Sequence, residues 1–196
     1  MVKLGREDSK YRQAKREGYL ARSVYKLKEL NERYRLLKPG LNVLDLGCHP
    51  GSWLQYTAQI IKNNGFITGV DIQALEFSLP ANVNFIQKDL FEVTEKELVL
   101  VSEKPYDLVL CDVAPRTTGI VHADNVKSAL LTSRALELAC RLLKPGGNFV
   151  SKIFWSGDAQ DILAGMKKVF DKAKAHKPDA SQAGSREIFL VGLGLK

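Results

Sequence analysis

The sequence predicts an α/β domain with a doubly wound, mostly parallel sheet and a helical extension at its N-terminus. Short apolar runs alternate with helical segments from residue 39 onward, and several of these runs end in a polar residue. Strands that alternate with helices favour a parallel sheet covered on both faces. Because no repeat or linker interrupts the pattern, we expect one domain over residues 1–196, composed of an N-terminal arm (1–38) and an α/β core (39–196).

The arm is expected to form a helix from about Tyr19, which the "LKPG" motif at Leu37–Gly40 ends. Its apolar side chains recur at helical spacing and would pack on the core: Leu20, Val24, Leu27 and Tyr34. A charged stripe recurs at the same spacing: Arg22, Lys26, Glu29 and Arg33.

In the core, the apolar runs predict strands at Leu41–Gly47, Phe66–Asp71, Val83–Asp89, Tyr106–Asp112, 148–154 and Arg186–Leu193, with a short strand near Ala175–Pro178. Apolar residues at helical spacing predict helices at 54–61, 95–103, 131–142 and 162–173. "NNG" at Asn63–Gly65 ends the first of these helices, and a second "LKPGG" motif at 143–147 ends the third.

The net charge of +7 is concentrated in the arm. Residues 1–38 contain 12 Lys and Arg against 5 Asp and Glu, whereas residues 39–196 contain 17 of each. A basic segment of this kind is typical of a protein that binds a polyanion such as RNA, since neutralised phosphates release their counterions. A solvated helix face is the alternative, and an anionic membrane fits less well because the arm lacks a broad apolar face.

Other features exclude several classes of protein. No apolar run reaches the ~20 residues of a membrane span, and no signal-peptide core is present, so we expect a cytoplasmic protein. The three cysteines are far apart and lack CxxC spacing, which predicts reduced thiols and no disulfide framework. The histidines are also scattered, so no metal is expected, and nothing calls for a partner subunit, which favours a monomer.

Polar residues at the predicted strand ends indicate a ligand site, because ligands of doubly wound sheets bind beyond the carboxyl ends of the strands. These residues are Asp45, Asp71, Asp89, Asp112 and Lys152. The loop "LDLGCHPGSW" is rich in glycine but matches neither G-x-G-x-x-G nor a P-loop. Its two glycines, Gly47 and Gly51, allow the backbone to approach a ligand closely.

The acids favour S-adenosylmethionine (SAM) over NAD as the ligand. Asp71 lies 20 residues beyond Gly51, where an acid that ends the second strand binds ribose hydroxyls. SAM carries a sulfonium and an amino group that Asp45 and Asp112 can accommodate, and Asp89 would lie near its adenine end. Few glycines are available for the pyrophosphate of NAD.

Lys152 is unusual because it lies within an apolar run expected to form a buried strand. Lysine is almost never buried unless another group pairs with it or uses it. This position therefore suggests a functional side chain.

The motifs "LDLGCHPGSW", "GVDI", "CDVAP", "LLKPGGNFVSKIF" and "SREIFLV" resemble, in order and spacing, the FtsJ/RrmJ (RlmE) family of RNA ribose 2′-O-methyltransferases. The resemblance covers nearly the whole chain. It implies a Rossmann-like SAM-dependent methyltransferase fold in which the final strand is antiparallel. It also implies a catalytic tetrad of Lys26, Asp112, Lys152 and Glu187. With the loop residues, the expected cofactor set is Asp45, Gly47, Pro50, Gly51, Trp53, Asp71, Asp89 and Asp112.

In such a tetrad Lys152 is expected to accept the proton of the ribose hydroxyl, provided that its amine is neutral when needed. A protonated Lys152 would instead orient the hydroxyl and stabilise oxyanion character. Asp112 would align Lys152, while Lys26 and Glu187 would position the ribose. The sequence leaves the protonation state open, because Lys26 would lower the proton affinity of Lys152 and Asp112 would raise it.

The closest resemblance implies methylation of a uridine in the A-loop of large-subunit (23S-type) rRNA. A tRNA methyltransferase shares the same fold and tetrad, and a catalytically silent RNA-binding or ribosome-assembly module is a further alternative. A small-molecule O-methyltransferase or an NAD enzyme would have no use for the basic arm.

The chain departs from the family pattern at His49, Ser52, Arg116 and the "WSGD" loop. Since no separate RNA-binding domain is visible, we expect the substrate to be a folded particle and not naked RNA.

Overall fold

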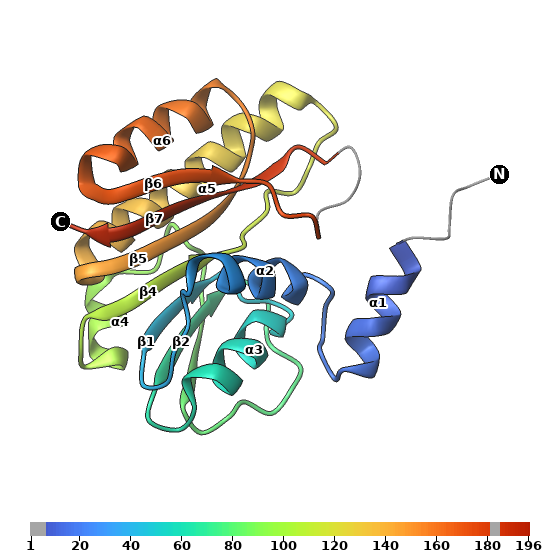
Figure 1. Ribbon diagram of the computed structural model, residues 1–196, viewed down its shortest axis with the longest axis vertical. Coiled ribbons are helices and arrows are strands. Elements are labelled where there is room, and N and C mark those ends of the chain that lie inside the picture. The colour runs from blue at the N-terminus through green and yellow to red at the C-terminus, as the bar shows by residue number, and fades with distance from the viewer. Residues whose placement is uncertain (1–6, 181–184) are drawn as a thin grey trace.

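The computed structural model describes residues 7–180 and 185–196, whose strands form one seven-stranded sheet (Figure 1). The helices are α1 (Glu7–Arg16), α2 (Val24–Tyr34), α3 (Ser52–Ile61), α4 (Glu95–Ser102), α5 (Val121–Leu142) and α6 (Gly157–Val169). The strands are β1 (Asn42–Leu46), β2 (Phe66–Asp71), β3 (Val83–Gln87), β4 (Tyr106–Cys111), β5 (Leu143–Phe154), β6 (Phe170–His176) and β7 (Glu187–Leu195). Within the described ranges, no helix combines the length and apolar character that crossing a membrane requires.

The strand order is β3-β2-β1-β4-β5-β7-β6, and β1 to β5 are parallel. β7 lies antiparallel between β5 and β6. The predicted fold class is therefore confirmed, including its final antiparallel strand. Because β1 lies between β2 and β4, the strand order reverses at β1 and β4, and the predicted loop and Asp112 follow these two strands.

Helices cover both faces of the sheet. α2 and α3 bury their apolar residues on one face, while α4, α5 and α6 bury theirs on the other. In Figure 1, α1 stands away from these layers. Each layer forms its own cluster of buried side chains, so strands such as β1 are buried on both sides. Continuous apolar strands of this kind are expected in parallel sheets.

Several predicted boundaries were wrong: α5 begins at Val121 and not near residue 131, and β5 begins at Leu143 and not at residue 148. The helix of the arm, α2, begins at Val24 and not near Tyr19, because residues 17–23 form a connection in which Gly18 adopts a φ of +81°. The helix α1, which precedes this connection, was not predicted. The last helix does not extend to Ala173. It ends at Val169, and the following segment pairs with β7 as an edge strand. Phe170 is fully buried in the core, and this tertiary contact outweighs the helix propensity of the Lys-Ala sequence that follows it.

Candidate active site

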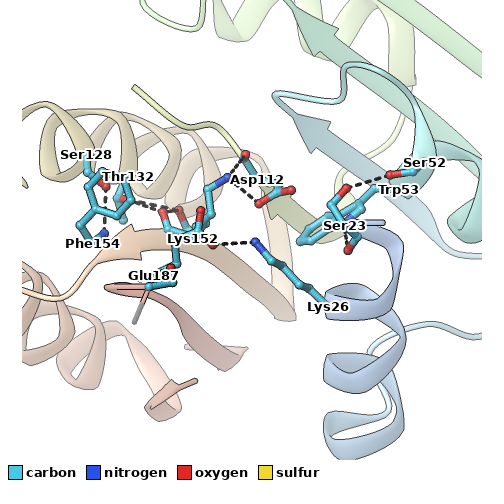
Figure 2. A network of polar contacts seen from close by, with 12 residues as sticks. Ser23, Lys26, Ser52, Trp53, Asp112, Ser128, Thr132, Lys152, Phe154 and Glu187 are labelled. Atoms are coloured by element: carbon cyan, nitrogen blue, oxygen red, sulfur yellow. Dashed lines mark hydrogen bonds and ion pairs between the residues drawn. The ribbon is translucent and has the colours of Figure 1, made fainter. Parts of the chain in front are cut away.

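Lys152 lies on β5, and its side chain is only 8% exposed. Its Nζ donates a hydrogen bond to the backbone oxygen of Asp112 at 2.7 Å, and Oδ1 of the same residue lies 2.8 Å away as an ion pair (Figure 2). The contact follows from the sheet, because β4 and β5 are parallel neighbours in which Cys111 lies beside Ser151. The buried lysine thus has a charge partner at the carboxyl end of the adjacent strand.

Lys26, in the first turn of α2, forms a second ion pair. Its Nζ donates a hydrogen bond to Oε2 of Glu187 at 2.7 Å. Glu187 is the first residue of β7, and its own backbone N–H donates to the Ser185 hydroxyl at 3.1 Å. Both side chains of the pair are mostly buried, with exposures of 15% and 24%. Solvent therefore screens this pair less than it would a pair on the open surface.

The strand register brings the two pairs together. Lys152 lies opposite Phe189, and Phe154 lies opposite Glu187. Opposed residues of antiparallel strands share one face of the sheet, so Lys152 and Glu187 point to the same side. This is the face that α2 covers, and Figure 2 shows Lys26 reaching from α2 toward the two strands. Residues from four distant parts of the sequence thereby form one cluster of two lysines and two carboxylates.

The electrostatics of the cluster favour a protonated Lys152. Burial alone would lower the pKa of Lys152, since desolvation disfavours an ammonium. The carboxylates of Asp112 and Glu187 outweigh this effect, and the net pKa lies above the ordinary lysine value. Of the two opposing effects that the sequence left open, the attraction of Asp112 is therefore the one that the structure favours. A proton-accepting Lys152 must lose its own proton first.

Glu187 shows the complementary shift. Burial would raise the pKa of its carboxyl group, but Lys26 and, more weakly, Lys152 lower it to below the ordinary value. Glu187 is therefore ionised at neutral pH. The four formal charges of the cluster cancel in pairs.

A pocket of about 100 Å³ opens at the carboxyl ends of the neighbouring strands. It is lined by Gly47, Val70, Asp71, Ile72, Lys88, Asp89, Leu90, Val113 and Leu131. Three of the predicted cofactor residues, Gly47, Asp71 and Asp89, are in this lining, and Asp112 adjoins it through Val113. The other four, Asp45, Pro50, Gly51 and Trp53, do not line it.

The acids of the pocket are held by backbone hydrogen bonds. Asp71 accepts the N–H of His49 at 2.8 Å on one carboxylate oxygen and the N–H of Gln73 at 2.9 Å on the other. Asp89 accepts the N–H of Phe91 at 2.8 Å. Each carboxylate oxygen has a second lone pair, so these acids can still accept hydrogen bonds from ligand hydroxyl or amino groups.

Gly47 cannot be replaced without moving the site. Its φ is +75°, and a Cβ at this position would lie 2.3 Å from Cγ2 and 2.9 Å from Cα of Val113. Gly51 has a φ of +114°, and its Cβ would lie 2.2 Å from the Phe77 ring. The loop can thus pack against the segment that follows Asp112 only with glycine at position 47, and glycine at position 51 leaves room for the Phe77 ring.

Comparisons with known proteins identify the family of the chain. The model of the FtsJ-like methyltransferase family matches residues 19–195. A relative from Syntrophobacter fumaroxidans, named ribosomal RNA large subunit methyltransferase E, is 43% identical over 189 residues, which cover 96% of each chain. A relative of the same name from Desulfatibacillum aliphaticivorans is 44% identical over 93% of this chain and 88% of its own length. The chain belongs to the FtsJ-like methyltransferase family.

A solved structure from Plasmodium falciparum, described as a ribosomal RNA methyltransferase, is also similar to this FtsJ-like methyltransferase. It has a TM-score of 0.81 and 28% sequence identity, and the match covers 90% of this chain and 98% of that chain. The similarity therefore covers most of the chain.

Asp45 differs from the other acids of this methyltransferase in its complete burial without a hydrogen-bond partner in the described part of the chain. Its side chain is completely buried, and neither carboxylate oxygen has a hydrogen-bond partner among the described residues. Burial, followed by the nearby carboxylates of Asp112 and Asp71, raises its pKa well above the ordinary value. Asp45 therefore lies at the end of the strand that leads into the glycine loop, with a raised pKa and unused hydrogen-bonding capacity.

Trp53 connects the cofactor loop to the tetrad. It lies in the first turn of α3 and is 2% exposed. Its Nε1 donates a hydrogen bond to the backbone oxygen of Ser23 at 3.0 Å, and its ring stacks on Phe189 at a centroid distance of 5.9 Å. Ser23 directly precedes α2, so Trp53 holds the start of the helix that carries Lys26.

Two hydroxyl groups that the sequence analysis missed hold the other side of the tetrad. Thr132 donates to the backbone oxygen of Lys152 at 3.0 Å, and Ser128 accepts the N–H of Phe154, also at 3.0 Å (Figure 2). Both lie buried on α5 at a spacing of four residues, which places them on one helix face. Their polarity on an otherwise apolar face was the only sequence signal.

The pocket residues that the sequence analysis missed carry weaker signals. Ile72 and Lys88 directly adjoin the predicted acids Asp71 and Asp89, and Leu131 was assigned only to a helix stripe. Lys88 also forms an ion pair with Glu97 at 2.7 Å, which fixes it to the start of α4. Neighbourhood in sequence alone does not tell which residue beside a strand end faces the ligand.

Proposed function

We propose that this protein transfers a methyl group from SAM to a ribose 2′-hydroxyl of large-subunit ribosomal RNA, at a uridine of the A-loop. The observation that carries the proposal is the convergence of Lys26, Asp112, Lys152 and Glu187 beside an acid-lined pocket. Relatives that match nearly the whole chain are named ribosomal RNA large subunit methyltransferase E. Such a substrate would place the protein in the cytoplasm, where we expect it to act as a monomer.

The pocket and the acids around it fit SAM. Asp45 has two unpartnered carboxyl oxygens and lies near the carboxylates of Asp71 and Asp112. A cationic ligand would relieve the repulsion within this group of acids, whereas a pyrophosphate would increase it. Asp71 and Asp89 would accept hydrogen bonds from ribose hydroxyls and the adenine end, and Gly47 would allow close approach. When bound, SAM supplies an electrophilic methyl group on a sulfonium.

The tetrad would hold and deprotonate the ribose hydroxyl. We propose that Lys152, once its amine is neutral, accepts the proton of the 2′-hydroxyl as the oxygen attacks. Asp112 fixes the amine through two contacts below 3 Å. The Lys26–Glu187 pair orients the ribose from the α2 side. Fixing the attacking oxygen in line with the methyl group can contribute about 7–11 kcal/mol to catalysis.

Labelled-methyl transfer from SAM tests the proposal. The substrates are unmodified large subunits, the free large-subunit RNA and unmodified tRNA, each followed by mapping of the methylated nucleotide. We expect one 2′-O-methyluridine in the A-loop and faster transfer to subunits than to free RNA. Transfer to tRNA alone would contradict the proposed ribosomal RNA substrate. Tight SAM binding without transfer to any RNA would contradict the proposed enzymatic role.

A further inference from the structure

A groove of about 310 Å³ lies beside the C-terminal end of α2, away from the cofactor pocket. It is lined by Arg33, Tyr34, Lys172, Lys174, Val191 and Leu193. These residues come from α2, β6 and β7, which are far apart in the sequence. We call it the α2–β6 groove.

The register of β6 and β7 explains why two lysines face this groove. Lys172 lies opposite Leu193 and Lys174 lies opposite Val191, so each lysine shares a sheet face with an apolar partner. Two residues after Lys174 on β6, His176 lies opposite Phe189, which packs under α2. The helix ends at Tyr34, and the two lysines mark the part of the same face that lies alongside this end.

The three cations of the groove are available for a ligand. Arg33, Lys172 and Lys174 are exposed, and none of them forms an ion pair with a carboxylate in the described part of the chain. The nearest acid on the same stripe of α2, Glu29, already accepts hydrogen bonds from His176 and from the N–H groups of residues 179 and 180. The positive charge of the groove is therefore not neutralised from within.

The groove is aligned with the tetrad along α2. Lys26 meets Glu187 at the first turn of the helix, and Arg33 borders the groove seven residues later. At 1.5 Å per residue this separation is roughly 10 Å along the axis. Both sites lie on the same face of the sheet. A strand whose ribose lies at Lys152 can thus reach the groove within a few nucleotides.

We propose that the α2–β6 groove binds the phosphodiester backbone of the RNA substrate and fixes the strand relative to the tetrad. The inference rests on the proposed function and adds its docking site. Arg33, Lys172 and Lys174 contact the phosphates, and Tyr34, Val191 and Leu193 form an apolar floor for sugar and base. A small inorganic anion would use the cations but not this floor.

A charge-matched pair of variants tests the groove. The groove variant is Arg33→Gln/Lys172→Gln/Lys174→Gln, and the control is Lys96→Gln/Lys167→Gln/Lys168→Gln. The control residues are exposed on α4 and α6, which cover the opposite face, and both variants lose three positive charges. Binding to unmodified large subunits and to free large-subunit RNA is measured over a series of salt concentrations, together with SAM affinity and methyl transfer.

We expect the groove variant to bind RNA at least 10-fold more weakly than the control at moderate salt. Its log–log salt dependence should be shallower by about 2, as expected when three phosphate contacts are lost. SAM affinity should match that of the control, because none of the three groove residues lines the cofactor pocket. Equal RNA affinity and equal salt dependence in the two variants would overturn the groove proposal.

The binding measurement separates this inference from the proposed function. If the wild-type protein binds RNA through the groove but transfers no methyl group, the groove stands and the proposed reaction fails. If the wild-type protein methylates RNA while the groove variant binds like the control, the reaction stands and the groove fails.

Discussion

At Lys152, the cost of burying an ammonium is offset by a carboxylate on the adjacent strand. The same contact that makes burial possible raises the pKa of the lysine, because Asp112 stabilises the charged form. A general base with a raised pKa is rarely neutral at physiological pH. The rate of transfer must then depend on the small neutral fraction.

The first prediction is therefore an alkaline pH profile. The single-turnover rate of methyl transfer should rise with pH and continue to rise toward the ordinary lysine pKa of about 10.4. Asp112→Asn removes the group that raises the pKa most, so the rise should occur at lower pH, although the rate itself will fall. A rate that stays flat or falls with pH would instead assign Lys152 the role of an ammonium that orients the hydroxyl.

Asp45 gives a second prediction at the residue scale. Burial and neighbouring acids raise the pKa of Asp45 and so favour its protonated form, whereas a cation placed nearby favours its ionised form. SAM binding should release a proton, whereas S-adenosylhomocysteine, which lacks the sulfonium, should release less. Calorimetry in two buffers of different ionisation enthalpy measures this difference. Asp45→Asn should abolish it, and equal proton release by both ligands in the wild type would contradict the account.

At the scale of elements, the start of α2 is held in place by hydrogen bonds to two other elements, β7 and α3. Lys26 bonds Glu187 on β7, and the preceding Ser23 accepts a hydrogen bond from Trp53 on α3. The cofactor loop leads directly into α3. A change in the loop can therefore be transmitted to Lys26.

The third prediction concerns this connection. Trp53→Phe keeps an aromatic ring against Phe189 but loses the hydrogen bond to Ser23, which should cost about 1 kcal/mol of unfolding free energy. Because Trp53 does not line the pocket, SAM affinity should stay within about twofold. Transfer should slow because Lys26 is less well positioned. Denaturant unfolding, SAM titration and transfer rates are compared with Trp155→Phe, whose side chain is 43% exposed. A large loss of SAM affinity would indicate direct contact with the cofactor.

Element types were more predictable than their ends. Each of the five parallel strands corresponds to an apolar run that is bounded by turn-forming residues, so the local sequence is enough to predict that the strand exists. The local sequence does not predict where β6 starts, because "FDKAKA" contains helix-forming residues and becomes a strand only by pairing with β7. α1 was not predicted, and the start of α2 was placed five residues too early, although Gly18 gave a signal for a break before it.

At the scale of the whole molecule, the site depends on contacts that no local pattern specifies. Lys152 was identifiable from its apolar surroundings, and the acids from their positions at strand ends. The pairing of Lys26 with Glu187 joins residues 161 positions apart and arises only because β7 inserts beside β5. Composition alone suggested a solvated helix lysine at position 26, and the resemblance to a known family was needed to assign it.

The fourth prediction concerns the basic N-terminal arm. Residues 1–16 contain six Lys and Arg against two acids, so their removal lowers the net charge by four. If the arm contacts RNA phosphates, the truncated protein should bind large subunits more weakly and with a shallower salt dependence. SAM binding should be unchanged, since the pocket is formed by residues 47–131. Unchanged RNA affinity at every salt concentration would mean that the arm is only a solvated surface.

The most direct test of the tetrad is the single-turnover rate of 2′-O-methyl transfer by Lys152→Met. This variant keeps an apolar stem in β5 and removes the amine. Lys144→Met is the matched control, because Lys144 also forms an ion pair on β5, with Asp107. We predict that Lys152→Met loses about 10²–10⁴-fold in rate, with SAM and RNA affinity retained, and that the control transfers at the wild-type rate. Transfer by Lys152→Met at the rate of the control would contradict the assignment of Lys152 as the catalytic base.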